Sequence, residues 1–278
     1  MRNMQELVFL KLGGSLITEK AKRYTVRLDK LRSLAAEIRD ALDELEGLRL
    51  VVGHGSGSFG HFAVQDHLDP ANFPPSQRGR PRSETAYWTG FAEVWYRASQ
   101  LNRIVVEAMH EERVPVVSIS PSSAAVTRDG KIMSWDTAPL QAALSAGVMP
   151  LIFGDIVFDA TQGGKVLSTE ALIWHLATLM KPSRVLLAGL EAAVWEDFPD
   201  RTRPIQRITP STSGLVMDKI GGSHGPDVTG GMKSKVAEML ALVRAVPGLT
   251  VQIFSGEQGG NIRRALRGEP LGTRVTSD

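Results

Sequence analysis

The sequence contains no cysteine, and this absence removes three kinds of chemistry at once. The 278-residue chain can form no disulfide, offers no thiolate nucleophile and has no cysteine ligand for zinc. Long apolar runs are lacking too. The first run breaks at Lys11, which makes it too short for a signal-peptide core or a membrane span. We therefore expect a cytoplasmic location and no membrane partner.

The chain also has little net charge. Its 32 lysines and arginines almost balance 30 aspartates and glutamates, which leaves a formal charge of +2. Bulk electrostatics therefore gives no case for binding nucleic acid or a membrane surface. Any anion must be recognised by a few placed cations. The hydrophobic share of 42% is ordinary for a globular protein and sufficient for a substantial core.

Buried strands and amphipathic helices alternate in the predicted secondary structure. Leu7–Leu12 and Leu48–Gly53 are apolar runs typical of buried strands, and between them apolar residues recur every three or four positions from Leu28 to Leu45. Further strands are predicted at Val114–Ser118, Met149–Phe153, Arg184–Ala188, Thr250–Phe254 and, at the sheet edge, Gly272–Val275, with a hairpin of Asp155–Val157 and Val166–Ser168. Further helices are predicted at Glu84–Glu112, Ala138–Ala146, Lys233–Ala245, Asn261–Leu266 and from a cap at Ser168 or Thr169 to Met180.

This order predicts an α/β fold, a three-layer α/β/α sandwich with a mainly parallel central sheet. The stretch Asp69–Arg82 is rich in proline and arginine and is predicted to be a loop, either solvated or a mobile lid. No linker separates independent domains. We expect one domain over residues 1–278, with an acceptor-binding lobe at 1–180 and a nucleotide-binding lobe at 181–278.

A lysine and two glycines follow the first predicted strand, in Lys11-Leu12-Gly13-Gly14-Ser15. A lysine at the carboxyl end of a buried strand is costly without an anionic partner, and glycines let backbone N–H groups approach that anion closely. Lys20 follows nine residues later. The alternative is an ordinary turn whose lysine reaches solvent.

The second glycine-rich segment, His54–His61, directly follows the second strand. Gly55, Gly57 and Gly60 imitate a dinucleotide fingerprint, but the required acidic residue at the end of a following strand is missing. The segment is not a Walker A loop either. What remains is a glycine loop with two histidines, suited to an anion, or else a structural turn.

Two further motifs complete the set. Gly154-Asp155 lies at a strand end, where the aspartate could hold lysine ammonium groups or merely cap a turn. The segment Asp227–Lys235, with glycines at 230 and 231, opens an amphipathic helix and is either an anion site or a solvated basic helix start.

These motifs together suggest phosphate chemistry without a general base. No H-R-D catalytic loop occurs in the sequence. A phosphate-monoester acceptor explains this, because its second pKa near 6 makes it a nucleophile at neutral pH. Catalysis then consists of positioning two anions and neutralising their charge.

The motifs resemble those of the amino acid kinase superfamily: K-x-G-G-S at Lys11, G-D at Gly154 and G-G-M-x-x-K at Gly230. Within it, H-G-x-G-S-F-G-H at His54, T-x-K at Thr18 and D-V-T-G-G-M at Asp227 resemble the isopentenyl phosphate kinases, and fosfomycin kinases share the loop histidine. The resemblance implies transfer of the γ-phosphoryl group of ATP, with Mg²⁺, onto isopentenyl phosphate. It also implies a homodimer.

The resemblance assigns roles to individual residues. Lys11 and Lys235 would stabilise the transferring phosphoryl group, Lys20 would assist at the γ-phosphate, and Asp155 would orient the lysines. ATP contacts are implied for Lys11, Gly13, Gly14, Ser15, Ser56, Gly230, Gly231 and Lys235. Acceptor contacts are implied for Gly55, Gly60, His61 and Gly154, with His61 selecting the acceptor phosphate.

Departures from the pattern leave alternatives open. Ser56 stands where the family more often has glycine or alanine, and Gly189–Trp195 keeps only Glu191 of an aspartate-rich nucleotide-binding stretch. A kinase of another small phosphate or phosphonate such as fosfomycin, or a non-catalytic nucleotide-binding regulator, is therefore the alternative. Aromatic residues at helical spacing would suit the wall of an isoprenoid-tail pocket or ordinary core packing: Tyr87, Trp88, Phe91 and Trp95.

Overall fold

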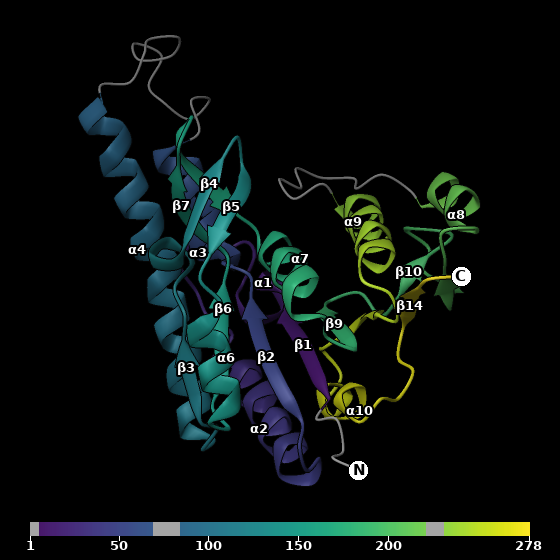
Figure 1. The fold of residues 1–278 in the computed structure, drawn as a ribbon. Helices are drawn as coiled ribbons and strands as arrows, with labels where there is room; N and C mark the ends of the chain where they lie inside the picture. Colours follow the sequence, from purple (N-terminus) through teal and green to yellow (C-terminus); the bar gives the residue numbers. More distant parts are fainter. Residues whose placement is uncertain (1–5, 69–83, 221–230) are drawn as a thin grey trace.

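A computed structural model describes residues 6–68, 84–220 and 231–278. The predicted loop Asp69–Arg82 and the stretch Asp227–Gly230 lie outside these residues. An eight-stranded sheet forms the centre of the molecule (Figure 1). Its order is β12 (Arg207–Ile208), β14 (Thr273–Thr276), β13 (Thr250–Ser255), β9 (Arg184–Gly189), β1 (Leu7–Leu12), β2 (Arg49–His54), β6 (Met149–Phe153) and β3 (Val116–Ser118).

The pairing of the strands confirms a mainly parallel sheet. From β13 to β3 every neighbouring pair is parallel, and only β14 runs antiparallel to β13. β1 is the middle of this arrangement and all six of its residues are buried, as expected for a strand covered on both faces. Since β9 pairs directly with β1, one continuous sheet joins the residues before and after 180. The division into two lobes remains a prediction.

Helices cover both faces of the sheet and complete the three layers. One face packs against α1 (Gly14–Ile17), α2 (Leu28–Glu44), α4 (Glu84–Glu111) and α10 (Asn261–Leu266). The other face packs against α6 (Ala138–Ser145), α7 (Thr169–Met180) and α9 (Gly231–Ala245). Along β1 the side chains alternate between these layers: Val8 and Leu10 face α2, whereas Phe9 faces α7. The predicted three-layer sandwich is confirmed.

A second sheet of four strands stands beside the first (Figure 1). Its order is β5 (Lys131–Trp135), β4 (Ala125–Arg128), β7 (Asp155–Asp159) and β8 (Gly163–Leu167). The predicted hairpin is confirmed as β7–β8. The sequence analysis missed β4–β5, although Asp129-Gly130 between them, with φ of 50° and 74°, is a strong hairpin signal.

Two predictions about local structure were wrong. The segment His54–His61 is not a loop throughout, because α3 (Gly57–His67) begins within it and carries His61. The last strand is not the sheet edge, because β12 pairs outside β14. The remaining short elements are α5 (Pro121–Ala124), α8 (Ser213–Lys219), β10 (Val194–Trp195) and β11 (Pro204–Ile205). No helix in the described part of the chain combines the length and the apolar character that a membrane span requires.

Candidate active site

The two glycine-rich turns predicted to bind phosphate meet where β1 and β2 end. The Gly55 amide donates a hydrogen bond to the Leu12 carbonyl, at 3.0 Å. A Cβ at Gly14 would lie 2.5 Å from the Gly57 nitrogen, and a Cβ at Gly55 would lie 2.8 Å from the Gly14 nitrogen. Glycine is therefore required for the two backbones to approach this closely. The carboxyl edge of the parallel strands is also where α/β sheets bind ligands.

The Thr18 side chain links the two glycine-rich turns through hydrogen bonds. Its hydroxyl donates to the Gly14 carbonyl at 2.8 Å and accepts from the Ser58 amide at 3.0 Å. Gly57 starts α3 with φ +51°, a conformation that other residues rarely adopt. Further along, a Cβ at Gly60 would lie 2.1 Å from Ser56 Oγ, so the serine that departs from the family pattern lies directly against Gly60.

The end of β6 and the start of α7 converge on the same place. The His54 carbonyl accepts from the Gly154 amide at 3.0 Å and from the Thr169 hydroxyl at 2.6 Å. A Cβ at Gly154 would lie 3.2 Å from Thr169 Oγ1 and 3.6 Å from the Ser56 nitrogen. Four elements, β2, β6, α3 and α7, therefore meet around the predicted acceptor residues Gly55, Gly60 and Gly154.

The buried lysine has a carboxylate partner. Lys11, 8% exposed, forms an ion pair with Glu170 in the first turn of α7. Burial raises the pKa of Glu170, but the charges of Lys11 and Lys235 outweigh it, so that the pKa lies below its usual value. Glu170 is therefore ionised at neutral pH. Since Lys235 acts on the same carboxylate from α9, two of the three predicted catalytic lysines lie around Glu170.

A second carboxylate belongs to this cluster. Glu238 follows Lys235 by three residues on α9, which places both on one face of the helix. Burial and the negative charge of Glu170 raise the pKa of Glu238, while Lys11 and Lys235 oppose this. The cluster therefore combines two lysines with two acids.

That Asp155 orients the lysines stays a prediction, and the contacts described for it are of another kind. Asp155 accepts from the Ile156 amide at 2.8 Å and makes long contacts to Ser122 N (3.4 Å) and Ser120 Oγ (3.5 Å). Burial raises its pKa to about 6. The carboxylate beside Lys11 is that of Glu170, in the first turn of α7.

The two histidines of the glycine-rich segment have different surroundings. His54 is fully buried and stacked on Phe153, and burial lowers its pKa to about 4. Its ring nitrogens lie 3.1 Å from the Gly55 carbonyl oxygen and 3.3 Å from Asn102 Oδ1. It is a neutral structural residue. His61 is partly exposed on α3, where its ring contacts Phe62 edge-on at 5.5 Å.

The other predicted residues lie around this edge. The Gly13 amide donates to the Ala188 carbonyl at 2.8 Å, and Ser15 lies in α1. Lys20 is exposed in the loop that follows α1. Gly231 starts α9 with φ +69°, whereas Gly230 is outside the described residues.

The aromatic residues predicted to line a pocket or the core differ in their burial. Phe91 is buried in a small apolar cluster with Ala63 of α3, Val94 of α4 and Ile156 of β7. It also stacks on Phe158 at 4.9 Å. Other members of the stretch, Tyr87 and Trp88, pack beside it, whereas Trp95 is 42% exposed and donates to Ser122.

Comparison with known proteins adds the family. A family model described as "Amino acid kinase family" matches residues 6–255. The chain belongs to the amino acid kinase family. The match runs from β1 to the end of β13 and so includes the whole cluster of Lys11, Glu170, Lys235 and Glu238.

Relatives within the amino acid kinase family are similar over almost their whole length. The isopentenyl phosphate kinase of Methanocaldococcus jannaschii is 31% identical over 97% of this chain and 98% of its own. That of Methanothermobacter thermautotrophicus is 32% identical over 97% and 99%. A solved structure of an isopentenyl phosphate kinase, 28% identical, covers 97% of this chain and 100% of its own with a TM-score of 0.77.

The described part of the site offers backbone donors and cations that suit phosphate. Closely approaching glycine backbones and two lysines are suited to a polyanion such as ATP. Within residues 6–68, 84–220 and 231–278, no group of three or more histidine, aspartate and glutamate side chains could hold a metal ion. Sequence reasoning missed Glu170 and Glu238. The one available signal was an acid in the first turn of a predicted helix.

Proposed function

We propose that this chain is an isopentenyl phosphate kinase, which converts ATP and isopentenyl phosphate into ADP and isopentenyl diphosphate. The observation that carries the chemistry is that Lys11 and Lys235 act on one carboxylate beside the paired glycine turns. The acceptor is inferred from full-length relatives that bear this name. An isoprenoid-phosphate substrate also fits a site with an adjoining apolar cluster.

Lys11 and Lys235 neutralise the charge of the phosphoryl group as it moves between two polyanions. In the resting protein Glu170 holds Lys11 in place, which keeps the buried ammonium charge compensated. When phosphates bind, they take over part of this compensation. Positioned cations are worth most in such a water-poor site, because little reorganisation accompanies the reaction.

The donor and the acceptor occupy opposite sides of the glycine turns. On the donor side, Gly13, Gly14, Ser15 and Ser56 contact the ATP phosphates together with Gly230 and Gly231, and Lys20 assists at the γ-phosphate. On the acceptor side, Gly55, Gly60 and Gly154 hold the acceptor phosphate, and His61 donates to it. Because this phosphate has its second pKa near 6, it attacks without a general base.

The apolar tail of the acceptor lies toward the cluster between α3, α4 and β7. Ala63 and His61 share α3, so the same helix would contact the tail and the phosphate. Phe91 and Ile156, both buried, give this region an apolar wall. Mg²⁺ would be carried by the ATP phosphates, as is usual where a protein offers few carboxylates.

A homodimer and a cytoplasmic location are also part of the proposal. Large apolar side chains are exposed on α4, at Tyr96 and Trp95, and on the neighbouring strand β3, at Val117. Covering them against a second copy would remove apolar surface from water. Light scattering with size-exclusion chromatography measures the mass directly, and a monomer at micromolar concentration would contradict the dimer.

The acceptor is tested by measuring ADP release with a panel of small phosphates. We expect the highest kcat/KM with isopentenyl phosphate, and much lower values with fosfomycin and with short alkyl monophosphates. A preference for fosfomycin would keep the chemistry and change the substrate. If no acceptor supported ADP release while ATP still bound, the proposal of a kinase would be wrong.

A further inference from the structure

Lys20 lies on a small hairpin at the protein surface. Thr18 and Val26 form an antiparallel bridge, and the Glu19 amide donates to the Thr25 carbonyl at 2.9 Å. We call residues 18–26 the Lys20 hairpin. Lys20 is exposed within it, and so are its neighbours. The position of the Lys20 ammonium group therefore depends on how the hairpin as a whole is held.

One face of α3 holds this hairpin. The Arg23 guanidinium lies 4.6 Å from the centre of the Phe62 ring and pairs through two nitrogens with the Asp66 carboxylate, Nη2 lying 3.1 Å from Oδ1. The Tyr24 ring lies 5.7 Å from that of Phe59. The three α3 residues are spaced by three and four positions, so they form one stripe along the helix.

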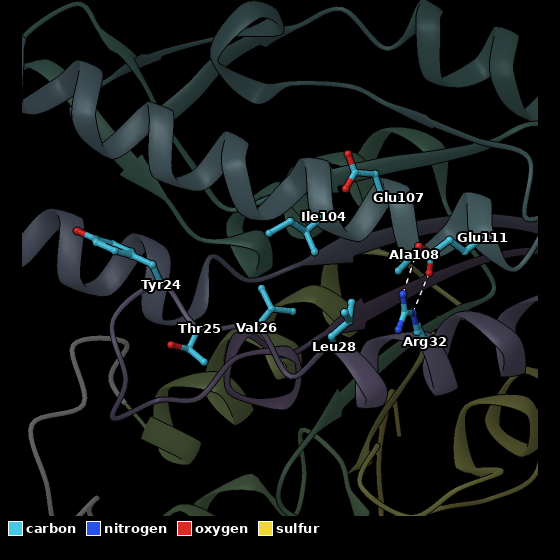
Figure 2. A pocket seen from close by; sticks show the side chains of 9 residues that line it. All are labelled: Tyr24, Thr25, Val26, Leu28, Arg32, Ile104, Glu107, Ala108 and Glu111. Carbon is cyan, nitrogen blue, oxygen red and sulfur yellow. Dashed lines mark hydrogen bonds and ion pairs between the residues drawn. The ribbon is translucent and has the colours of Figure 1, made fainter.

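The opposite side of the hairpin is less closely packed. Tyr24, Thr25 and Val26 border a pocket of about 500 Å³ whose far wall includes Ile104 and Glu107 of α4 (Figure 2). Thr18, at the root of the hairpin, is fixed to the glycine turns by its hydroxyl. The root is therefore anchored, and beyond it the hairpin is restrained by its contacts with α3 and by the Arg97 guanidinium of α4, which lies 4.3 Å from the centre of the Tyr24 ring. Of the residues near Lys20, Arg23 makes its contacts with α3.

We propose that Arg23 is a positioning residue for Lys20. Because it stacks on Phe62 and pairs with Asp66, it fixes the Lys20 hairpin to α3, the helix that carries His61. The inference rests on the proposed function, in which Lys20 acts at the γ-phosphate and His61 at the acceptor. The hairpin and helix then form one unit, which keeps the donor-side lysine and the acceptor-side histidine at a constant separation.

Arginine is suited to this task. An exposed ion pair contributes little to stability, but a planar guanidinium that pairs through two nitrogens and stacks on a ring fixes a direction as well as a distance. Losing it should change the position of Lys20 far more than the stability of the fold. A small misplacement of a catalytic group is enough to slow the chemical step substantially.

A double-mutant cycle tests the inference, with ADP release from ATP and isopentenyl phosphate as the assay. We expect Lys20→Ala to lower kcat by about 100-fold and Arg23→Ala by about 10-fold. The KM for the acceptor should change less than twofold, because His61 stays on α3. The double variant should be no more than about twofold slower than Lys20→Ala, since Arg23 acts only through Lys20.

Two further variants separate positioning from general structure. Arg263→Ala breaks a similarly exposed bidentate pair with Glu44 between α10 and α2, and should leave kcat unchanged. Arg23→Lys retains the charge but not the planar fork, so it should restore only part of the loss. The Tm of Arg23→Ala should stay within about 3 °C of that of the wild type.

The outcomes distinguish this inference from the proposed function. If Lys20→Ala had normal kcat, the proposed role of Lys20 would be wrong. If Lys20→Ala were impaired but Arg23→Ala were normal, or if their effects multiplied, Arg23 would not act through Lys20 and the inference would fail. A loss in Arg263→Ala equal to that in Arg23→Ala would likewise overturn it.

Discussion

Two carboxylates at the same edge of the sheet have opposite electrostatic surroundings. Asp155 at the start of β7 is contacted by backbone and serine groups, and burial raises its pKa to about 6. Glu170 at the start of α7 is also buried, yet the lysines around it lower its pKa. Burial acts on both in the same direction, so the neighbouring cations decide which carboxylate is firmly ionised.

This comparison indicates where the charge of the site is organised. Lys11 and Lys235 come from opposite ends of the chain, and Glu170 is the group on which both act. Asp155 has an environment that favours the neutral acid at mildly acidic pH. The region around α7 therefore holds the charged cluster, whereas Asp155 of β7 lies among backbone and serine groups.

The largest effect on activity is expected when Lys11 is replaced. Lys11→Ala should lower kcat by about 10²–10³, with little change in ATP affinity, because the ammonium group acts mainly on the transition state. Steady-state kinetics and ATP binding measured separately check this, with the exposed Lys131→Ala of β5 as a control. Weaker ATP binding with unchanged kcat would make Lys11 a ground-state binding residue instead.

The next effect concerns stability between pH 4 and 7. The pKa of Asp155 is raised in the folded state, to about 6 from 3.8, so its contribution is full below pH 4 and is lost as the pH rises through 6. The pKa of His54 is lowered, to about 4 from 6.5, so its contribution is full above pH 6.5 and is lost as the pH falls toward 4. Each shift corresponds to about 3 kcal/mol.

In the wild type, the pH dependences of stability that come from Asp155 and from His54 have opposite slopes. We expect Asp155→Asn to remove one of them, so that the unfolding free energy falls by about 3 kcal/mol more than that of the wild type on acidification from pH 7 to pH 4. Urea unfolding at several pH values measures this, with exposed Asp29→Asn as the matched control. Parallel pH curves for Asp155→Asn and wild type would contradict the environment described for this carboxylate.

Exchanging the two carboxylates for amides tests the comparison directly. Glu170→Gln leaves two lysines without the charge between them, and we expect kcat to fall by about 10–100-fold. Asp155→Asn should cost less, because lysines are not among the causes that shift its pKa. The kcat of both variants is measured at pH 8, where Asp155 and Glu170 are both ionised in the wild type, and the two losses are compared. A larger loss in Asp155→Asn than in Glu170→Gln would support the orienting role predicted for Asp155.

The sequence was sufficient for the architecture because the signals there are local. Apolar runs predicted β1 and β6 with their observed bounds, and helical spacing predicted α2 to within one residue of its end. The short helix α10 was also predicted with its observed bounds. The lysines of the site could also be predicted from the sequence, since each follows or precedes a glycine pair. Periodicity and turn chemistry depend on neighbouring residues, so they can be inferred without knowing the rest of the fold.

What the sequence did not reveal depends on contacts between distant segments. Glu170 contacts Lys11 across 159 residues, and only the placement of α7 beside β1 brings them together. The helix at Gly57 was hidden by glycines that are needed for close approach to Gly14, not for a loop. Glycine is usual in both settings, so composition alone could not separate them.

The smallest expected effect concerns how α7 is held. The Ser168 hydroxyl accepts from the Ala171 amide at 3.1 Å and caps the helix. Ser168→Ala should lower the unfolding free energy by about 1 kcal/mol, but kcat should stay within about twofold. The Thr169 hydroxyl independently fixes the same turn to the His54 carbonyl. Ser168→Asn retains a cap and should restore stability. If Ser168→Ala lost as much activity as Glu170→Gln, the cap would be what keeps Glu170 beside Lys11.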